Sequence, residues 1–118
     1  MKNGPAYSAT GYKQTRFTAL TNAFQNVSTG PANFYGWNIL NLTASTMYVK
    51  FSDTSAGAVG TAAVKFSLLI PANGTAFFEL QFPLRFSTQI RAYAVTGAGD
   101  ADATAPGTAA IVDVFYMD

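Results

Sequence analysis

Hydrophobic residues alternate with polar ones along most of this chain, and a two-residue period of this kind is the pattern of a half-buried β-strand. It is plainest in residues 47–52, where Met47, Val49 and Phe51 alternate with more polar neighbours. Similar patterns occur in residues 17–19, with a continuation at 24–28 beyond a break, and in residues 34–42, 64–70, 75–82, 90–95 and 111–117. No stretch has the convincing 3.6-residue period of an amphipathic helix. The pattern therefore predicts an all-β protein of seven or eight strands.

Turn signals separate these runs of alternating residues. Asn73-Gly74 lies between residues 64–70 and 75–82, and because both residue types accept positive φ we expect a hairpin there. Pro83 has no N–H to donate, so pairing should break at that position. Short strands joined by turns are typical of an antiparallel β-sandwich, and eight strands in two sheets would make it jelly-roll-like. The strand order stays open.

The chain length favours one domain. With 118 residues, we expect an extended arm over residues 1–15 and a single β-sandwich domain over residues 16–118. The N-terminus lacks the apolar core of a signal peptide, so we expect synthesis without an export signal. No apolar stretch approaches the ~20 residues of a membrane span, which predicts no membrane partner.

Charged residues are scarce: they make up 11% of the chain, against an ordinary share of about 25%. Since surface charge keeps proteins soluble, this scarcity favours a surface that is partly hidden in an assembly. The alternative is that the plentiful Thr, Ser, Asn and Gln residues solvate the surface instead. The net charge is +1 and no basic run occurs, so we expect no nucleic-acid partner.

The chain contains no cysteine and no histidine. Their absence removes disulfides and thiol nucleophiles, together with the commonest general base and transition-metal ligand. No serine lies in a nucleophile-elbow pattern. The only glutamate, Glu79, would have to face Asp53 or Asp113 across a cleft of about 5 to 10 Å to hydrolyse a glycoside, and no pattern suggests this. We therefore predict a protein that is not an enzyme, without catalytic residues, metal or cofactor.

Two pairs of residues are candidates for binding. Asp100 and Asp102 could both reach one hard cation from a Gly- and Ala-rich loop over residues 97–107, but calcium needs six to eight oxygen ligands, which favours two solvated loop acids. Tyr35 and Trp37 fall on one face of the strand predicted at 34–42. If exposed they could stack on sugar rings, and if buried they would be core or a subunit contact.

Asp113 lies in the last predicted strand, between two valines. Val112, Val114 and Tyr116 form the cleaner apolar stripe, so we expect them to face the core and Asp113 to face water. In the alternative, Asp113 is a buried acid that requires a partner, for which Arg85 and Arg91 are the candidates.

A series of short motifs covers residues 35–116. The motifs are Tyr35-Gly36-Trp37-Asn38-Ile39-Leu40-Asn41, Tyr48-Val49-Lys50-Phe51, Leu69-Ile70-Pro71-Ala72-Asn73-Gly74, Leu84-Arg85-Phe86-Ser87-Thr88-Gln89-Ile90, the acidic loop 96–102 and Val112-Asp113-Val114-Phe115-Tyr116. In these motifs the chain resembles the capsid decoration, or cement, proteins of tailed bacteriophages. Pro83 and Gln89 depart from the family pattern, which has Gly at both places. These departures predict different local turns.

The resemblance implies a β-sandwich that binds the major capsid protein on the outside of the shell, cements neighbouring subunits and stabilises the expanded shell. Such proteins are often homotrimers. It also implies a location on the virion surface after synthesis in the host cytoplasm. We predict an interaction surface formed by Tyr35, Trp37, Arg85, Arg91, Asp100 and Asp102. The alternative is a receptor- or glycan-binding module of a head or tail fibre that uses Tyr35 and Trp37.

Overall fold

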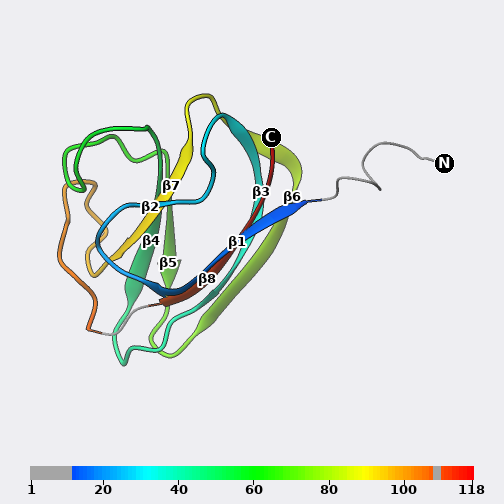
Figure 1. The fold of residues 1–118 in the computed structure, drawn as a ribbon. Helices are drawn as coiled ribbons and strands as arrows, with labels where there is room; N and C mark the ends of the chain where they lie inside the picture. The colour runs from blue at the N-terminus through cyan, green and yellow to red at the C-terminus, as the bar shows by residue number, and fades with distance from the viewer. Residues whose placement is uncertain (1–11, 108–109) are drawn as a thin grey trace.

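The structure is a computed structural model that describes residues 12–107 and 110–118 (Figure 1). Within these residues the chain forms strands and no helix, so no described element is a helix that could cross a membrane. The strands are β1 (Lys13–Leu20), β2 (Gln25–Asn26), β3 (Ala32–Leu40), β4 (Met47–Asp53), β5 (Phe66–Ile70), β6 (Thr75–Phe86), β7 (Ile90–Val95) and β8 (Ala110–Met117). The all-β prediction is confirmed.

The strands form two antiparallel sheets of four, which we call sheet A and sheet B. Sheet A has the order β1-β8-β3-β6 and sheet B the order β2-β7-β4-β5; in Figure 1 sheet A lies to the right. Among the described strands, only β4 and β5 are neighbours both in sequence and in a sheet. Every other connection carries the chain from one sheet to the other. This is a jelly-roll order, in which two Greek keys share a double sheet.

The core lies between the two sheets, and Phe34 of β3 is near its centre. The Phe34 ring lies 4.9 Å from the Phe51 ring of sheet B and 5.8 Å from the Phe86 ring of sheet A, measured between centroids. All three side chains are fully buried. Burial of one such side chain contributes roughly 1.5–3 kcal/mol, so aromatic contacts from both sheets hold the sandwich closed.

A bulge in β3 changes which side chains face the core. The register with β8 shifts between Phe34 and Gly36, so Tyr35 is an extra residue on this strand. As a result Phe34 and Trp37 lie on the same side, with stacked rings 5.7 Å apart. Gly36 allows close approach of β6, because a Cβ at this position would lie 2.3 Å from the Phe78 carbonyl oxygen. The prediction that Tyr35 and Trp37 share one face is therefore wrong.

The turn at residues 71–74 forms, but the predicted hairpin does not. Asn73 has a φ of 53° and the Gly74 N–H donates to the Pro71 carbonyl at 2.9 Å, as expected for a tight reversal. However, β5 pairs with β4 and β6 pairs with β3, so this turn passes from sheet B to sheet A. Turn residues specify that the chain reverses, whereas packing of the two sheets selects the partner strand.

Asn41, just after β3, holds two of the cross-sheet connections together. Its fully buried side-chain amide donates to the carbonyls of Ser45, Ile70 and Pro71, at 2.9, 3.1 and 3.0 Å. Its side-chain oxygen accepts from the Thr43 N–H and hydroxyl, both at 2.8 Å. One polar side chain therefore satisfies backbone groups of both the β3–β4 and the β5–β6 connections.

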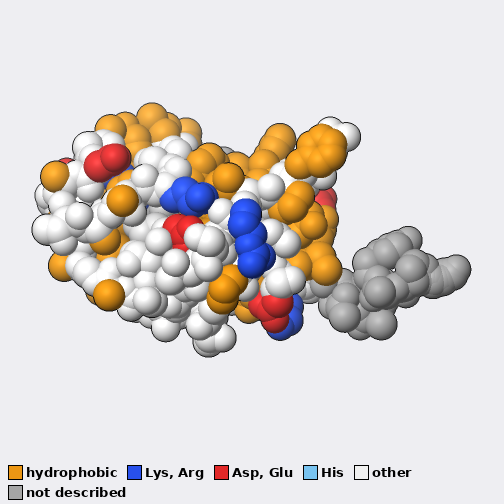
Figure 2. All heavy atoms as spheres, turned by 90° about the horizontal axis from the view of Figure 1, so that it is seen from above, with side chains coloured by type: hydrophobic (Ala, Val, Ile, Leu, Met, Phe, Trp, Pro, Cys, Tyr) orange, Lys and Arg blue, Asp and Glu red, His pale blue; other side chains and the backbone are white. Residues whose placement is uncertain are grey.

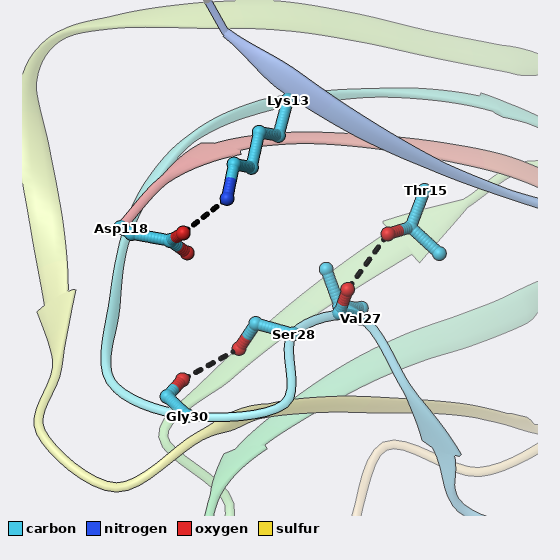
Figure 3. A network of polar contacts seen from close by, with 6 residues as sticks. All are labelled: Lys13, Thr15, Val27, Ser28, Gly30 and Asp118. Atoms are coloured by element: carbon cyan, nitrogen blue, oxygen red, sulfur yellow. Dashed lines mark hydrogen bonds and ion pairs between the residues drawn. The ribbon is translucent and has the colours of Figure 1, made fainter.

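The first strand is tied to both sheets (Figure 3). Lys13 of β1 forms an ion pair with Asp118, next to β8. The Thr15 hydroxyl donates to the Val27 carbonyl at 2.7 Å, which links β1 to the segment after β2 in the other sheet. Strand β1 begins at Lys13, so residues 13–15 of the expected arm belong to the sandwich. Residues 1–11 lie outside the described residues.

Candidate interaction surface

Strand β6 forms one edge of sheet A, opposite β1, and β3 is its only described neighbour. Its register with β3 jumps from the Gly36–Glu79 pair to the Phe34–Leu84 pair. Tyr35 alone therefore faces residues 80–83, which form a bulge in β6. The interruption that was expected from Pro83 is confirmed. Bulges and prolines of this kind prevent an edge strand from extending the sheet to another molecule through backbone pairing.

Three phenylalanines on β6 are exposed. Phe77, Phe78 and Phe82 are 63%, 52% and 77% exposed, and Phe82 belongs to the bulge. Figure 2 shows hydrophobic side chains gathered along the upper rim and the right-hand side, the side on which Figure 1 places sheet A. Large exposed aromatic side chains on one edge strand are a signature of a binding surface. We call Phe77, Phe78 and Phe82 the β6 aromatic edge.

The β6 aromatic edge was not predicted as a site, although a signal for it exists. The alternation in residues 75–82 assigns Phe78 and Phe82 to the core face. Phe78 does face the core side, with its ring 5.7 Å from the Trp37 ring, but at the sheet edge half of it remains open to solvent. Phe77 lies on the opposite face. A strand needs aromatic residues on only one face to close a core. Phenylalanines on both faces of one strand therefore indicate that some of them face solvent or a partner.

The outer face of sheet A carries a buried acid. Asp113 is 5% exposed, and its carboxylate accepts hydrogen bonds from Gln14 at 2.9 Å and from Arg16 at 3.0 and 3.2 Å. Val112 and Val114 are buried in the core, so the predicted facing of this strand is right. Asp113 is nevertheless not solvated, because side chains of the adjacent strand β1 cover it. Its partner is Arg16 rather than Arg85 or Arg91.

The two predicted aromatic residues lie in different environments. Trp37 is 7% exposed and belongs to the core. Tyr35 is half-buried, and its ring lies 4.8 Å from the Tyr12 ring. A paired aromatic face for a sugar ring is therefore not present on β3, and Tyr35 is the member of the pair that reaches the surface.

The charged residues of the predicted surface lie on different sheets. Arg85 is exposed on β6, with its Nη1 3.4 Å from the Asn33 side-chain oxygen. Arg91, on β7 of sheet B, is half-buried with its guanidinium 4.1 Å from the centre of the Phe24 ring. Asp100 and Asp102 lie in the loop that follows β7. The six predicted residues thus do not form one continuous surface.

The loop acids do not form part of a larger acidic group. Asp100 is exposed, whereas Asp102 is half-buried and accepts a hydrogen bond from the Thr104 N–H at 2.9 Å. Within residues 12–107 and 110–118, no three acidic, His or Cys side chains gather as a metal site would require.

Asp53 anchors the polar corner between β6 and β7. Its carboxylate accepts hydrogen bonds from the N–H groups of Ser87, Thr88 and Gln89 at 2.9, 2.8 and 3.2 Å, and from the Ser87 hydroxyl. Burial, the largest single effect, raises the pKa of Asp53, but these donors together outweigh it and the pKa is lowered. Gln89 does not adopt positive φ, and its amide donates to the Ser28 carbonyl at 2.7 Å.

No protein-family model matches the chain, and no curated protein sequence or solved structure is significantly similar to it. Function is therefore inferred from the residues and their arrangement. Among the described residues, the β6 aromatic edge is the surface with the clearest binding chemistry.

Proposed function

We propose that this protein is a non-enzymatic structural component of a tailed-phage virion, a decoration protein that binds the outside of the capsid. The observation that carries the proposal is the β6 aromatic edge, in a chain with only 11% charged residues. Aromatic side chains dominate the energetics of protein interfaces, and charged residues are depleted at interface centres. The resemblance of residues 35–116 to cement proteins supplies the kind of partner, the major capsid protein.

The proposed action is mechanical. A protein that spans neighbouring capsid subunits and binds only the expanded shell stabilises that state by mass action, by about 2.7 kcal/mol per site at 100 times its Kd. The sandwich suits this task because polar side chains tie its connections together, as Asn41 and Asp53 do. In the proposed homotrimer, closed rotational symmetry repeats a single interface around the axis.

The bulge in β6 favours contact through side chains. Residues 80–83 have no backbone partner on β3, and they present Phe82 at the sheet edge. A bulge and a proline in the same place hinder β-strand addition by another chain. We therefore propose that Phe82 and its neighbours pack into an apolar depression on the shell.

The fibre alternative has less support. It requires Tyr35 and Trp37 to present their rings to a sugar, and Trp37 is buried in the core. A sugar-binding site on sheet A would therefore have to be formed by surface residues other than Tyr35 and Trp37.

The test is binding to purified capsids of the phage that encodes the chain, prepared as empty shells in the expanded and unexpanded states. Saturable binding to expanded shells, with a raised melting temperature of the shell, is the expected result. Absence of binding to either form would overturn the proposal and make glycan screening the next step.

A further inference from the structure

Loops cover the outer face of sheet B. Residues 54–65 follow β4 and residues 96–107 follow β7, and both loops lie on the sheet B side of the molecule in Figure 1. The two loops touch, since a Cβ at Gly60 would lie 3.1 Å from the Ala101 carbonyl oxygen. The Lys50 ammonium donates to the Gly99 carbonyl, which attaches the second loop to β4.

Four neighbouring side chains beneath these loops are hydrogen-bond donors. The register of β4 with β7 places Lys50 opposite Tyr93 and Ser52 opposite Arg91, all on the outer face of sheet B. Directly opposed residues have Cβ atoms about 4.5–5.5 Å apart. Both β7 side chains also contact one ring, because Phe24 lies 5.0 Å from the Tyr93 ring and 4.1 Å from the Arg91 guanidinium. We call Lys50, Ser52, Arg91 and Tyr93 the donor cluster.

Most polar atoms of the donor cluster are buried without a partner. Lys50, Ser52 and Tyr93 are fully buried. The Ser52 and Tyr93 hydroxyls, and Nε and Nη1 of Arg91, have no hydrogen-bond partner among the described residues. Buried donors that lack an acceptor destabilise a fold, and buried charges do so more strongly. Three side chains with such donors, Ser52, Arg91 and Tyr93, lie beside the Lys50 ammonium, and this arrangement requires an acceptor.

The nearby acids do not supply that acceptor. Within the described chain, the ion pairs are Lys13–Asp118 and Arg16–Asp113, so no carboxylate lies within 4.0 Å of Lys50 or Arg91. Burial, and then the charges of Asp100 and Asp102, raise the pKa of Tyr93, so both acids lie near the cluster. The carboxylate of Asp102 is engaged by Thr104 and Asp100 is exposed.

We propose that the donor cluster binds one small inorganic anion of halide size between sheet B and its covering loops. The sign of the ligand follows from two cationic groups and two hydroxyls, each of which donates hydrogen bonds. Its small size follows from the full burial of Lys50, Ser52 and Tyr93, which leaves no opening for a larger molecule. The inference is independent of the proposed role in the capsid, because it concerns the opposite sheet.

The test uses the full-length protein and compares thermal unfolding in sodium chloride, sodium bromide and sodium gluconate at equal ionic strength. We expect a saturable rise in Tm with either halide. Tyr93→Phe removes only the hydroxyl and keeps the ring against Phe24, so the apparent halide affinity should fall about tenfold, the effect of one hydrogen bond to a charged group. Tyr48→Phe, on the same sheet face outside the cluster, is the matched control.

Crystals grown in bromide locate the ion independently of any variant. An anomalous peak in contact with the Tyr93 and Ser52 hydroxyls is the expected result. A water molecule at that position without anomalous signal would overturn the proposal, as would a Tm equal in all three salts. A halide effect that Tyr93→Phe leaves unchanged would also overturn it, because the ion would then bind elsewhere.

Discussion

Phe82 offers the sharpest test of the β6 aromatic edge. It is 77% exposed, and with about 200 Å² for a phenylalanine side chain it leaves roughly 150 Å² for a partner to cover. At about 25 cal/mol per Å², complete burial would stabilise a complex by at most ~4 kcal/mol. Alanine retains part of the contact, so we expect Phe82→Ala to weaken binding to expanded shells by about 2–3 kcal/mol, or about 30- to 150-fold in Kd.

The assay is co-sedimentation of the labelled protein with expanded capsids over a range of concentrations. Leu42→Ala is the matched control, because Leu42 is 48% exposed but lies beyond the end of β3, away from the bulge. Both variants should keep the free energy of unfolding within about 0.5 kcal/mol of the unmodified protein, since neither side chain is buried. A Kd for Phe82→Ala within threefold of that for Leu42→Ala would refute the assignment of this edge as the binding surface.

Three further predictions concern the fold and are measured by urea denaturation. Gly36→Ala should destabilise the protein by about 2–4 kcal/mol, because the added Cβ overlaps the Phe78 carbonyl oxygen; an unchanged midpoint would contradict this close contact. Asn41→Ala should cost about 3 kcal/mol, since several buried backbone groups lose their partner, and a loss below about 1 kcal/mol would show that water replaces the amide. Asp53→Asn should cost about 1 kcal/mol at pH 7. Because the folded pKa of Asp53 is lowered, its contribution is present above the unfolded value of about 3.9 and is lost as pH falls through the folded pKa, so the two proteins should converge in acid. A difference that persists at pH 2 would contradict an electrostatic origin.

The strands and most turns could be predicted because they depend on local chemistry. The alternation in residues 47–52 corresponds to β4, and the separate runs at 75–82 and 90–95 correspond to β6 and β7. The partner strands could not be predicted, because they depend on how two sheets pack. Asn73-Gly74 has the chemistry of a hairpin turn, yet it joins strands of different sheets.

Side-chain facing was predictable only where the strand is regular. In β8 the stripe of Val112 and Val114 identifies the core face. In β3 a single extra residue, Tyr35, reverses the alternation before Trp37, and nothing in the local pattern reveals a bulge whose cause is the approach of β6. The partner of Asp113 was missed for a related reason, because Arg16 reaches it only through the pairing of the first and last strands.

The candidate surface was the part least accessible from sequence. Of the six predicted residues, Arg85 lies on the same strand as the β6 aromatic edge, whereas Trp37 is buried and Arg91 belongs to the other sheet. Phe82 is exposed because it lies in a bulge at a sheet edge. The two-residue alternation of the sequence predicts neither the bulge nor the edge. The sequence itself shows phenylalanines on both faces of β6. That they are exposed follows only from the position of β6 at the edge of its sheet.

The place of β1 beside β8 also has a consequence for synthesis. Lys13 pairs with Tyr116, and the Lys13–Asp118 contact joins residues 105 positions apart. Strand β8 lies between β1 and β3 in sheet A, so β1 has no neighbour among the described strands of its sheet until β8 has been synthesised. Contacts this distant in sequence make folding slow, commonly milliseconds to seconds. Closure of sheet A therefore waits for β8, and during that interval the phenylalanine-rich β6 segment is a target for chaperones or for aggregation.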